Sequence, residues 1–158
     1  MMFELLLDAS IFRAKEFITE ESSLCVKASE LSHFLDQEKT LAKKIGERKK
    51  KFREDNGYSV EMTNERLEEE CKISVETMRK TIIGTTKCSR NFLYKFCVGL
   101  HMSVEEANQF FVLCGGNLNE DFMADFICIK ALERGASIEE FIGAFEKNVG
   151  IKISIRSR

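Results

Sequence analysis

Residues 64 to 84, NERLEEECKISVETMRKTIIG, hold two short amphipathic segments separated by only a few residues. Leu67 and Cys71 are four positions apart, so they share one face of the first segment. Met78 and Ile82 repeat that spacing in the second. We therefore predict two helices joined by a tight turn, which is the geometry of a helix-turn-helix motif. Because both apolar faces must meet one core, this pair limits how the rest of the chain can pack.

The polar positions of the second motif helix are left on its outer side. They are Glu76, Thr77, Arg79 and Lys80. In a DNA-binding protein such a row enters the major groove, whereas in a protein that does not bind DNA it is a solvated surface. The pattern alone leaves both alternatives open.

The composition indicates an all-α fold. The chain has no proline, and nothing in it resembles short, evenly spaced strands separated by turn clusters. Its 158 residues, 44% of them hydrophobic, suffice for one well-packed domain with helical additions. Thirteen phenylalanines and no tryptophan predict a core built largely from phenylalanine.

Three helices are expected before the motif. Residues 2 to 18 repeat apolar positions imperfectly and predict the first, and Ser22 or Ser23 can cap the second. The second would turn inward Val26, Leu31, Phe34 and Leu35. Whether this N-terminal pair packs on its own domain or on a second subunit stays open.

The third of these helices is basic. Residues 38 to 55 contain eight basic and four acidic residues, a net charge of +4, and form the one sizeable basic block of the sequence. Leu41, Ile45 and Phe52 can seat the helix while its lysines point outward, and Asn56-Gly57 ends it. A phosphate-binding face and an ordinary solvated face both fit this pattern.

Caps and glycines delimit the helices that follow. Thr63 and Ser74 are the predicted N-caps of the two motif helices, and Gly84 ends the second. Capping-box patterns at Ser103-Val-Glu-Glu106 and Ser137-Ile-Glu-Glu140 predict two further helix starts. Other helix ends are expected at Gly115-Gly116 and Gly135.

Apolar spacing predicts which faces of these later helices are buried. The inward residues are expected to be Leu93, Phe96, Cys97 and Leu100; Val104, Ala107, Phe111 and Cys114; Phe122, Phe126 and Ile129; and Ile138, Phe141, Ile142, Phe145 and Val149. This gives about eight helices in all. The last residues, IKISIRSR, alternate like a strand and fit either a flexible tail or an edge between subunits.

The segment from Leu67 to Ser103 resembles the Cro and lambda-repressor-like helix-turn-helix family, the XRE-type regulators. The matching features are Leu67 in the first motif helix, Ile73-Ser74 in the turn, Thr77-Met78 in the second helix, Gly84 at its end, and Phe92 to Leu100 followed by His101-Met102-Ser103. Upstream, IGERKKKFRED resembles the family's first helix, with about four extra residues before Thr63. The resemblance covers roughly residues 41 to 115.

The resemblance implies a lambda-repressor-like bundle with helical extensions at both ends. We divide the chain into an N-terminal helical extension (1–37), a helix-turn-helix domain (38–115), a C-terminal helical pair (116–150) and a basic tail (151–158). It further implies a regulator that binds double-stranded DNA as a homodimer. The position match places Val75, Glu76 and Lys80 at base edges, and Asn64, Thr77 and Arg79 near the DNA backbone. Phosphate contacts are expected from Lys49, Lys50, Arg53, Lys87 and Arg90.

The sequence departs from the family at two positions and in its charge. The family prefers a small residue where this chain has Glu68, and a glycine where it has Lys72. Residues 61 to 76 contain six glutamates against one arginine and one lysine, a net charge of −4. Like charges beside phosphate are unfavourable. The alternative hypothesis is therefore a protein-interaction module, an adaptor or inhibitor that has lost DNA binding and holds a protein partner through its acidic helix or its apolar N-terminal helix.

Catalysis, metal binding and membrane insertion are not expected. The six cysteines include no C-x-x-C pair and no zinc spacing with either histidine, so we interpret them as small buried residues without disulfides. Nucleophile, phosphate-loop and metalloprotease motifs are missing, and we predict no enzyme activity and no cofactor. Without a signal sequence or a long apolar stretch, a cytoplasmic location is expected.

Overall fold

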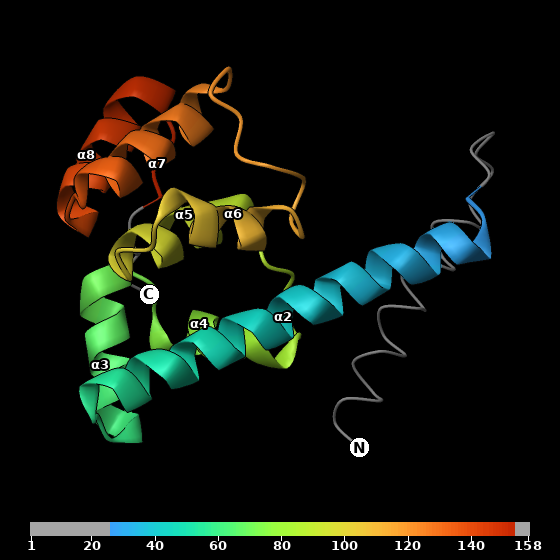
Figure 1. Ribbon diagram of the computed structural model, residues 1–158, viewed down its shortest axis with the longest axis horizontal. Coiled ribbons are helices and arrows are strands. Elements are labelled where there is room, and N and C mark those ends of the chain that lie inside the picture. Colours follow the sequence, from blue (N-terminus) through green and yellow to red (C-terminus); the bar gives the residue numbers. More distant parts are fainter. Residues whose placement is uncertain (1–25, 154–158) are drawn as a thin grey trace.

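The computed structural model describes residues 26–153, which are all-helical (Figure 1). Within this range the helices are α2 (Ala28–Asn56), α3 (Val60–Cys71), α4 (Val75–Ile83), α5 (Arg90–Gly99), α6 (Val104–Phe111), α7 (Met123–Arg134) and α8 (Ile138–Val149). The predicted all-α class is confirmed. The helix expected at residues 2 to 18 lies outside the described residues. None of the described helices is both long and apolar enough to cross a membrane.

The short helix α5 is the centre of the bundle. It packs against α3, α6, α7 and α8, while α2 lies along α3, α4 and α6. In Figure 1, α2 runs diagonally from the lower left, beside α3, to the right, where its N-terminal half projects past the other helices, and α7 and α8 are paired at the upper left. Seven of the ten residues of α5 are buried. The core is therefore arranged around this helix.

Phenylalanine dominates the core, as the composition predicts. The largest fully buried side chains are Phe96, Phe111, Phe141 and Phe145. The ring of Tyr94 on α5 lies 5.4 Å from that of Phe111 and 5.7 Å from that of Phe145, measured between centroids. One continuous hydrophobic cluster runs from α2 to α8. The predicted boundary between residues 115 and 116 is thus not a break in the core.

The N-terminal part of α2 differs from the prediction of two separate helices. A single helix of 29 residues spans both, so the predicted boundary between residues 37 and 38 lies inside it. It begins after Lys27, which makes no side-chain cap, and Ser22 and Ser23 lie outside the described residues. With no proline and only one glycine between residues 28 and 56, nothing in the sequence interrupts the helix. Its end at Gly57, in the left-handed conformation with φ 66°, is as predicted.

The start of α3 was predicted one turn too late. The N-cap is Ser59, whose hydroxyl accepts a hydrogen bond from the backbone N–H of Met62. Thr63 lies inside the helix, is buried, and donates its hydroxyl to the Ser59 carbonyl at 2.7 Å. A threonine can make this backward bond within a helix, so its capping tendency alone does not locate a helix start.

The two capping boxes behave differently. At α8 the box is complete: Ser137 accepts from the backbone of Glu140, and the Glu140 side chain accepts from the backbone of Ser137. At α6, Ser103 caps the helix as predicted, but the Glu106 carboxylate accepts from Arg48 Nε of α2 at 2.8 Å. The glutamate is therefore used to attach α2 to α6.

The predicted inward face of α7 is wrong at two of three positions. Phe122 is 64% exposed and Phe126 39%, whereas Ile129 is buried. The helix instead turns Asp125 and Cys128 inward, because the aspartate has partners on α5. After α8, residues 151–153 form neither helix nor strand; Ile153 is buried and its N–H donates to Glu146 Oε2 at 2.9 Å. Residues 154–158 lie outside the described range.

Helix α5 approaches α3 so closely that one position has no room for a side chain. A Cβ atom on Gly99 would lie 2.4 Å from the Glu70 carbonyl oxygen and 2.7 Å from Cys71 Cα. These are backbone atoms, which cannot rotate away. The glycine therefore fixes the distance between the two helices.

We predict that Gly99→Ala lowers the free energy of unfolding by about 2 to 4 kcal/mol, because α3 and α5 must separate to admit the methyl group. Urea denaturation followed by circular dichroism measures the change. Gly143→Ala is the matched control: it lies within α8 with nothing within 4 Å of the added Cβ, and should be neutral or raise stability by up to about 1 kcal/mol. If both substitutions change the free energy of unfolding equally, the close contact between α3 and α5 at Gly99 is not what makes that position sensitive.

Candidate nucleic-acid interface

The turn between α3 and α4 consists of three residues. Lys72 takes the left-handed conformation with φ 54°, at the position where the resembling family has glycine. Its carbonyl accepts from Lys95 Nζ of α5 at 3.0 Å, and its own Nζ lies 3.6 Å from Glu139 Oε1 of α8. Lys72 thus adopts a conformation that L-residues avoid, and it is in contact with two other helices, α5 and α8. The missing glycine does not prevent the turn.

The start of α4 is fixed by the predicted cap. The Ser74 hydroxyl accepts from the Thr77 N–H at 3.1 Å and donates to Thr77 Oγ1 at 2.8 Å. Met78 and Thr81 are buried, and Ile82 meets Gly46 of α2, where an added Cβ would lie 3.2 Å from its Cγ2. Gly84 ends the helix with φ 84°, as predicted. Helix α4 is therefore held by α2 on one side and by the turn at its start.

The outward side chains of α4 are accessible and carry an ion-pair network. Val75 is 38% exposed, and Glu76 and Arg79 are exposed. Arg79 Nη2 lies 2.7 Å from Glu76 Oε1, and Lys80 Nζ lies 3.6 Å from the same oxygen. The hydrogen bond from Arg79 lowers the pKa of Glu76 below its usual value. The carboxylate thus stays charged at neutral pH and offsets part of the positive charge of α4.

The basic residues of α2 divide into two groups. Lys44 and Arg48 turn toward α6, where Lys44 Nζ donates to Gln109 Oε1 at 3.4 Å and Arg48 pairs with Glu106. Lys49 and Arg53 follow Gly46 by three and seven residues, so they lie on the side of α2 that faces α4. The pKa of Lys49 is lowered, mainly by partial burial and to a smaller extent by the positive charge of Arg53. The two cations therefore lie close together.

The remaining predicted contacts lie in different surroundings. Lys50 on α2 is exposed, and Asn64 and Thr77 are half-buried. Lys87, between α4 and α5, is exposed; its Nζ lies 3.8 Å from Glu38 Oε1 and 4.8 Å from the centroid of the Phe34 ring. It is therefore anchored to the N-terminal half of α2.

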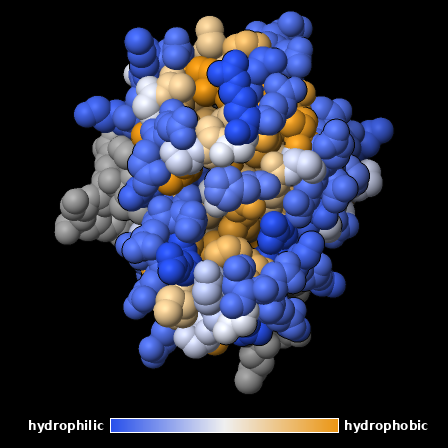
Figure 2. All heavy atoms as spheres, turned by 60° about the vertical axis from the view of Figure 1, so that its left-hand side comes forward, coloured by the Kyte–Doolittle hydropathy of each residue, from blue (hydrophilic) through white to orange (hydrophobic). Residues whose placement is uncertain are grey.

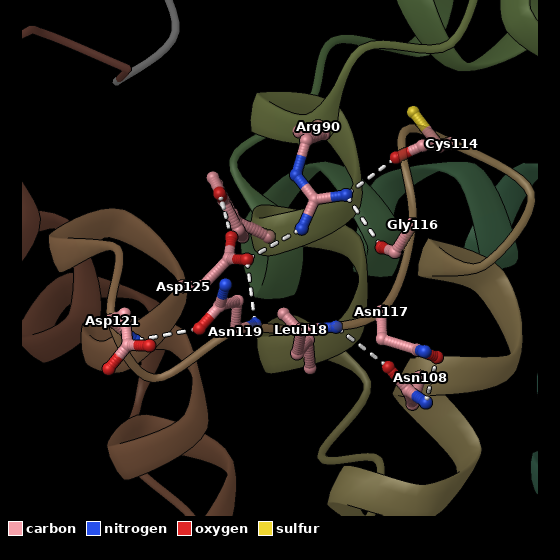
Figure 3. A network of polar contacts seen from close by, with 10 residues as sticks. Arg90, Asn108, Cys114, Gly116, Asn117, Leu118, Asn119, Asp121 and Asp125 are labelled. Carbon is pink, nitrogen blue, oxygen red and sulfur yellow. Dashed lines mark hydrogen bonds and ion pairs between the residues drawn. The ribbon is translucent and has the colours of Figure 1, made fainter.

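Arg90 does not reach outward as expected for a phosphate contact. Its Nη1 donates to the carbonyls of Cys114 at 2.6 Å and Gly116 at 2.9 Å, and its Nη2 donates to Asp125 Oδ2 at 2.7 Å (Figure 3). Gly115 and Gly116 have φ of 84° and 107°, a conformation that wraps this turn around the guanidinium. The prediction that Arg90 contacts phosphate is corrected: its guanidinium N–H groups bind the turn after α6 and Asp125 of α7.

Asp125 is the acceptor at the centre of this network. The Tyr94 hydroxyl donates to Oδ1, and the Asn119 N–H donates to Oδ2 at 2.9 Å. Burial opposes the charge of this carboxylate, but the hydrogen bonds from Tyr94 and Arg90 bring its pKa below the usual value. Burial and the bond to Asp125 raise the pKa of Tyr94. Sequence reasoning missed Asp125. The sequence does contain a signal for it: Asp125 lies three residues before Cys128 and four before Ile129, so it shares their apolar helix face.

A second surface lies between α3 and α8. A cleft of about 880 Å³ is lined by Glu65, Glu68, Glu69, Lys72, Glu139, Ile142 and Gly143. Figure 2, which brings forward the side of the molecule that carries α3 and α8, shows an apolar strip between hydrophilic margins. No residue of α4 lines this cleft. Glu68 points to solvent, so its size causes no clash with α5; the close crossing lies at Gly99.

Comparison with protein families, with curated proteins and with solved structures found no match. Within residues 26–153, no group of three or more histidine, cysteine or acidic side chains is placed to hold a metal ion.

We predict that Asp125→Asn lowers the free energy of unfolding by about 2 to 4 kcal/mol near neutral pH, because Arg90 then loses its buried counter-charge. Since the folded-state pKa of Asp125 is depressed, its stabilisation is present above the unfolded-state pKa and is lost as pH falls through the folded-state value. The difference in free energy of unfolding between wild type and variant should therefore become smaller at acidic pH. Urea denaturation at several pH values measures it.

Asp121→Asn is the control for this substitution, because Asp121 is exposed on the loop that precedes α7 (Figure 3). It should change stability by less than about 0.5 kcal/mol. If Asp125→Asn lowers the free energy of unfolding by the same amount at neutral and acidic pH, the charge of the aspartate is not what stabilises the network.

Proposed function

We propose that this chain is a sequence-specific DNA-binding transcriptional regulator that inserts α4 into the major groove, in a bundle of the Cro and lambda-repressor type. The supporting observation is the motif itself: α3 and α4 are joined by three residues, and the outward side chains of α4 are not covered by any other described helix. A helix used for base recognition needs both features.

Each exposed side chain of α4 has a suitable target. The Lys80 ammonium can donate to guanine, the Glu76 carboxylate can accept from the cytosine amino group, and the Val75 side chain can contact a thymine methyl. Arg79 suits a phosphate. In the free protein Glu76 pairs with Arg79 and Lys80, so binding must exchange these surface ion pairs for contacts with DNA. Such exposed pairs are weak, so contacts with DNA can replace them.

Phosphate contacts are assigned to Lys49, Lys50, Arg53 and Lys87. Lys49 and Arg53 lie on the α4 side of α2, and Lys87 follows the end of α4. Helix α4 thus has basic residues both on its neighbouring helix and in the loop beyond its end. The resemblance further implies that two copies bind a palindromic site.

We expect Lys80→Ala to weaken binding to the preferred duplex by about 1 to 3 kcal/mol and to relax the preference at one base pair. Selection from a random duplex pool identifies the site, and fluorescence anisotropy at several salt concentrations gives the affinity. Wild-type affinity should fall steeply as salt rises. Glu76→Gln should strengthen non-specific binding, because Arg79 and Lys80 lose their competing carboxylate.

Lys147→Ala is the matched control, an exposed lysine of α8 that should leave affinity and preference unchanged. The regulator hypothesis fails if wild type does not bind duplex DNA at low salt, or if Lys80→Ala and Lys147→Ala have the same effect.

The second candidate is a protein-interaction module, favoured by the acidic cleft between α3 and α8. Glu65, Glu68 and Glu69 of α3 line it together with the apolar Ile142. An apolar floor with acidic margins suits a basic segment of another protein. In this alternative, the glutamates of α3 are binding residues and α4 is an ordinary solvated helix.

The double substitution Glu68→Lys, Glu69→Lys distinguishes the two functions. A partner bound at the cleft should be retained by wild type and by Lys80→Ala in an affinity pull-down, and lost by the double variant. If binding of every recovered protein survives the charge reversal, the cleft is not a partner site. Unfolding curves of all variants confirm that the fold is intact.

A further inference from the structure

Two cysteines from distant parts of the chain meet in the wall of a cleft. Cys88 precedes α5, and Cys114 lies in the turn after α6. The cleft encloses about 950 Å³ between the N-terminal half of α2, the end of α4 and these two loops. Both cysteines are among its lining residues, with Phe34, Lys87 and Leu113. Of the two, Cys114 is partly exposed to this cleft.

The Cys114 side chain contacts Cys88 directly. Its Sγ lies 3.4 Å from the Cys88 carbonyl oxygen, to which it donates, while the Cys88 thiol donates to the Ser89 carbonyl at 3.6 Å. The two thiols lie close enough for each to shift the pKa of the other. Cys88 is 8% exposed, whereas Cys114 is partly open to the cleft. One sulfur is thus accessible, and its neighbour is shielded within reach of it.

The charges around Cys114 favour its thiolate. The hydrogen bond from Cys88 is the largest cause, and the charges of Arg90 and Lys87 act in the same direction, while burial and Glu38 oppose them. Together they lower the pKa of Cys114 to about 7. The same contact and burial raise the pKa of Cys88. Because thiolates are the reactive form, the accessible cysteine is also the nucleophilic one.

The other described cysteines lack these features. Cys71, Cys97 and Cys128 are fully buried, and burial raises the pKa of each. They match the prediction of small, buried, unreactive residues. Cys25 lies outside the described residues.

We propose that Cys114 and Cys88 form a hydroperoxide-sensitive dithiol, with Cys114 as the attacking and Cys88 as the resolving cysteine. The Cys114 thiolate attacks the terminal oxygen of the peroxide, the O–O bond breaks, and water or an alcohol leaves after protonation. The product is a sulfenic acid at Cys114. The Cys88 thiol then attacks that sulfur, an S–S bond forms, and a second water leaves. Two thiols are oxidised by two electrons, and one peroxide is reduced.

The disulfide would join the turn after α6 to the segment before α5. That segment contains Lys87, and Arg90 already holds the two regions together through the carbonyls of Cys114 and Gly116. Oxidation would therefore replace a reversible attachment by a covalent one. The chemistry does not depend on DNA binding, so it is tested separately from the proposed function.

The test treats the full-length, reduced protein with hydrogen peroxide near neutral pH and maps its peptides without reduction. The expected first product is a disulfide between Cys88 and Cys114. Cys88→Ser should instead accumulate a Cys114 sulfenic acid that dimedone traps. Cys114→Ser should lose at least about tenfold in the rate of thiol oxidation at Cys88, because the remaining thiol is mostly protonated. Cys25→Ser is the control and should form the same disulfide at the same rate.

Alkylation by iodoacetamide across pH provides an independent measurement. Cys114 should react with a midpoint near pH 7, below the value of about 8.5 for an ordinary cysteine. The proposal is overturned if another cysteine is oxidised first, if Cys114 proceeds to sulfinic acid without a disulfide, or if no cysteine reacts before the protein unfolds. Circular dichroism of each variant shows that it is folded.

Discussion

The ion pair between Arg90 and the buried Asp125 attaches α7 to the central helix α5. Arg90 begins α5, the central helix, and Asp125 lies on α7, 35 positions later in the chain. Besides the hydrogen bond between them, Arg90 donates to the carbonyls of Cys114 and Gly116, and Asp125 accepts from Tyr94 and from the Asn119 N–H. The buried Asp125 carboxylate could not stay charged without a partner except at a large desolvation cost, so the position of α7 depends on that of α5. The C-terminal helices are thus part of the domain that carries the motif.

The same arginine shows how a local motif and its surroundings compete for one side chain. Its position after the motif suits a phosphate contact, but its donors are taken by two carbonyls and a carboxylate. Lys87, three residues earlier, is exposed, and its ammonium lies 3.8 Å from Glu38 Oε1. On α4, Glu76 pairs with Arg79 and Lys80, and under the proposed function DNA would compete with it for these two cations. Those ion pairs are exposed and weak, whereas the partner of Arg90 is a buried carboxylate.

The sequence predicted well the features that depend on near neighbours in the chain. The end of α2 at Gly57, the cap at Ser74, the capping box at Ser137 and the buried faces of α5 and α8 are all local patterns. It failed where a distant partner decided the outcome. Asp125 turns inward only because Tyr94 and Arg90 receive it, and this rotation leaves Phe122 and Phe126 exposed. Glu106 leaves its capping box for Arg48 for the same kind of reason.

In the candidate interface, spacing alone identified the outward residues of α4, but it could not divide the basic block. Whether a lysine of α2 faces α4 or α6 depends on how the helices cross, and that crossing is set by Gly46 and Ile82. The reactive pair of cysteines was equally hidden, because Cys88 and Cys114 come together only through the turn that Arg90 holds.

The absence of a side chain at Gly99 also has a mechanical meaning. Helix α5 rests directly on the backbone of α3 at Glu70 and Cys71, and α3 leads through three residues into α4. A contact between backbones has no rotamers to rearrange and little compressibility. Helix α4 therefore cannot sink toward the core or change its tilt without moving α3 and α5 as one body. Substitutions on the outer surface of α4 should therefore exchange its side chains without shifting the helix.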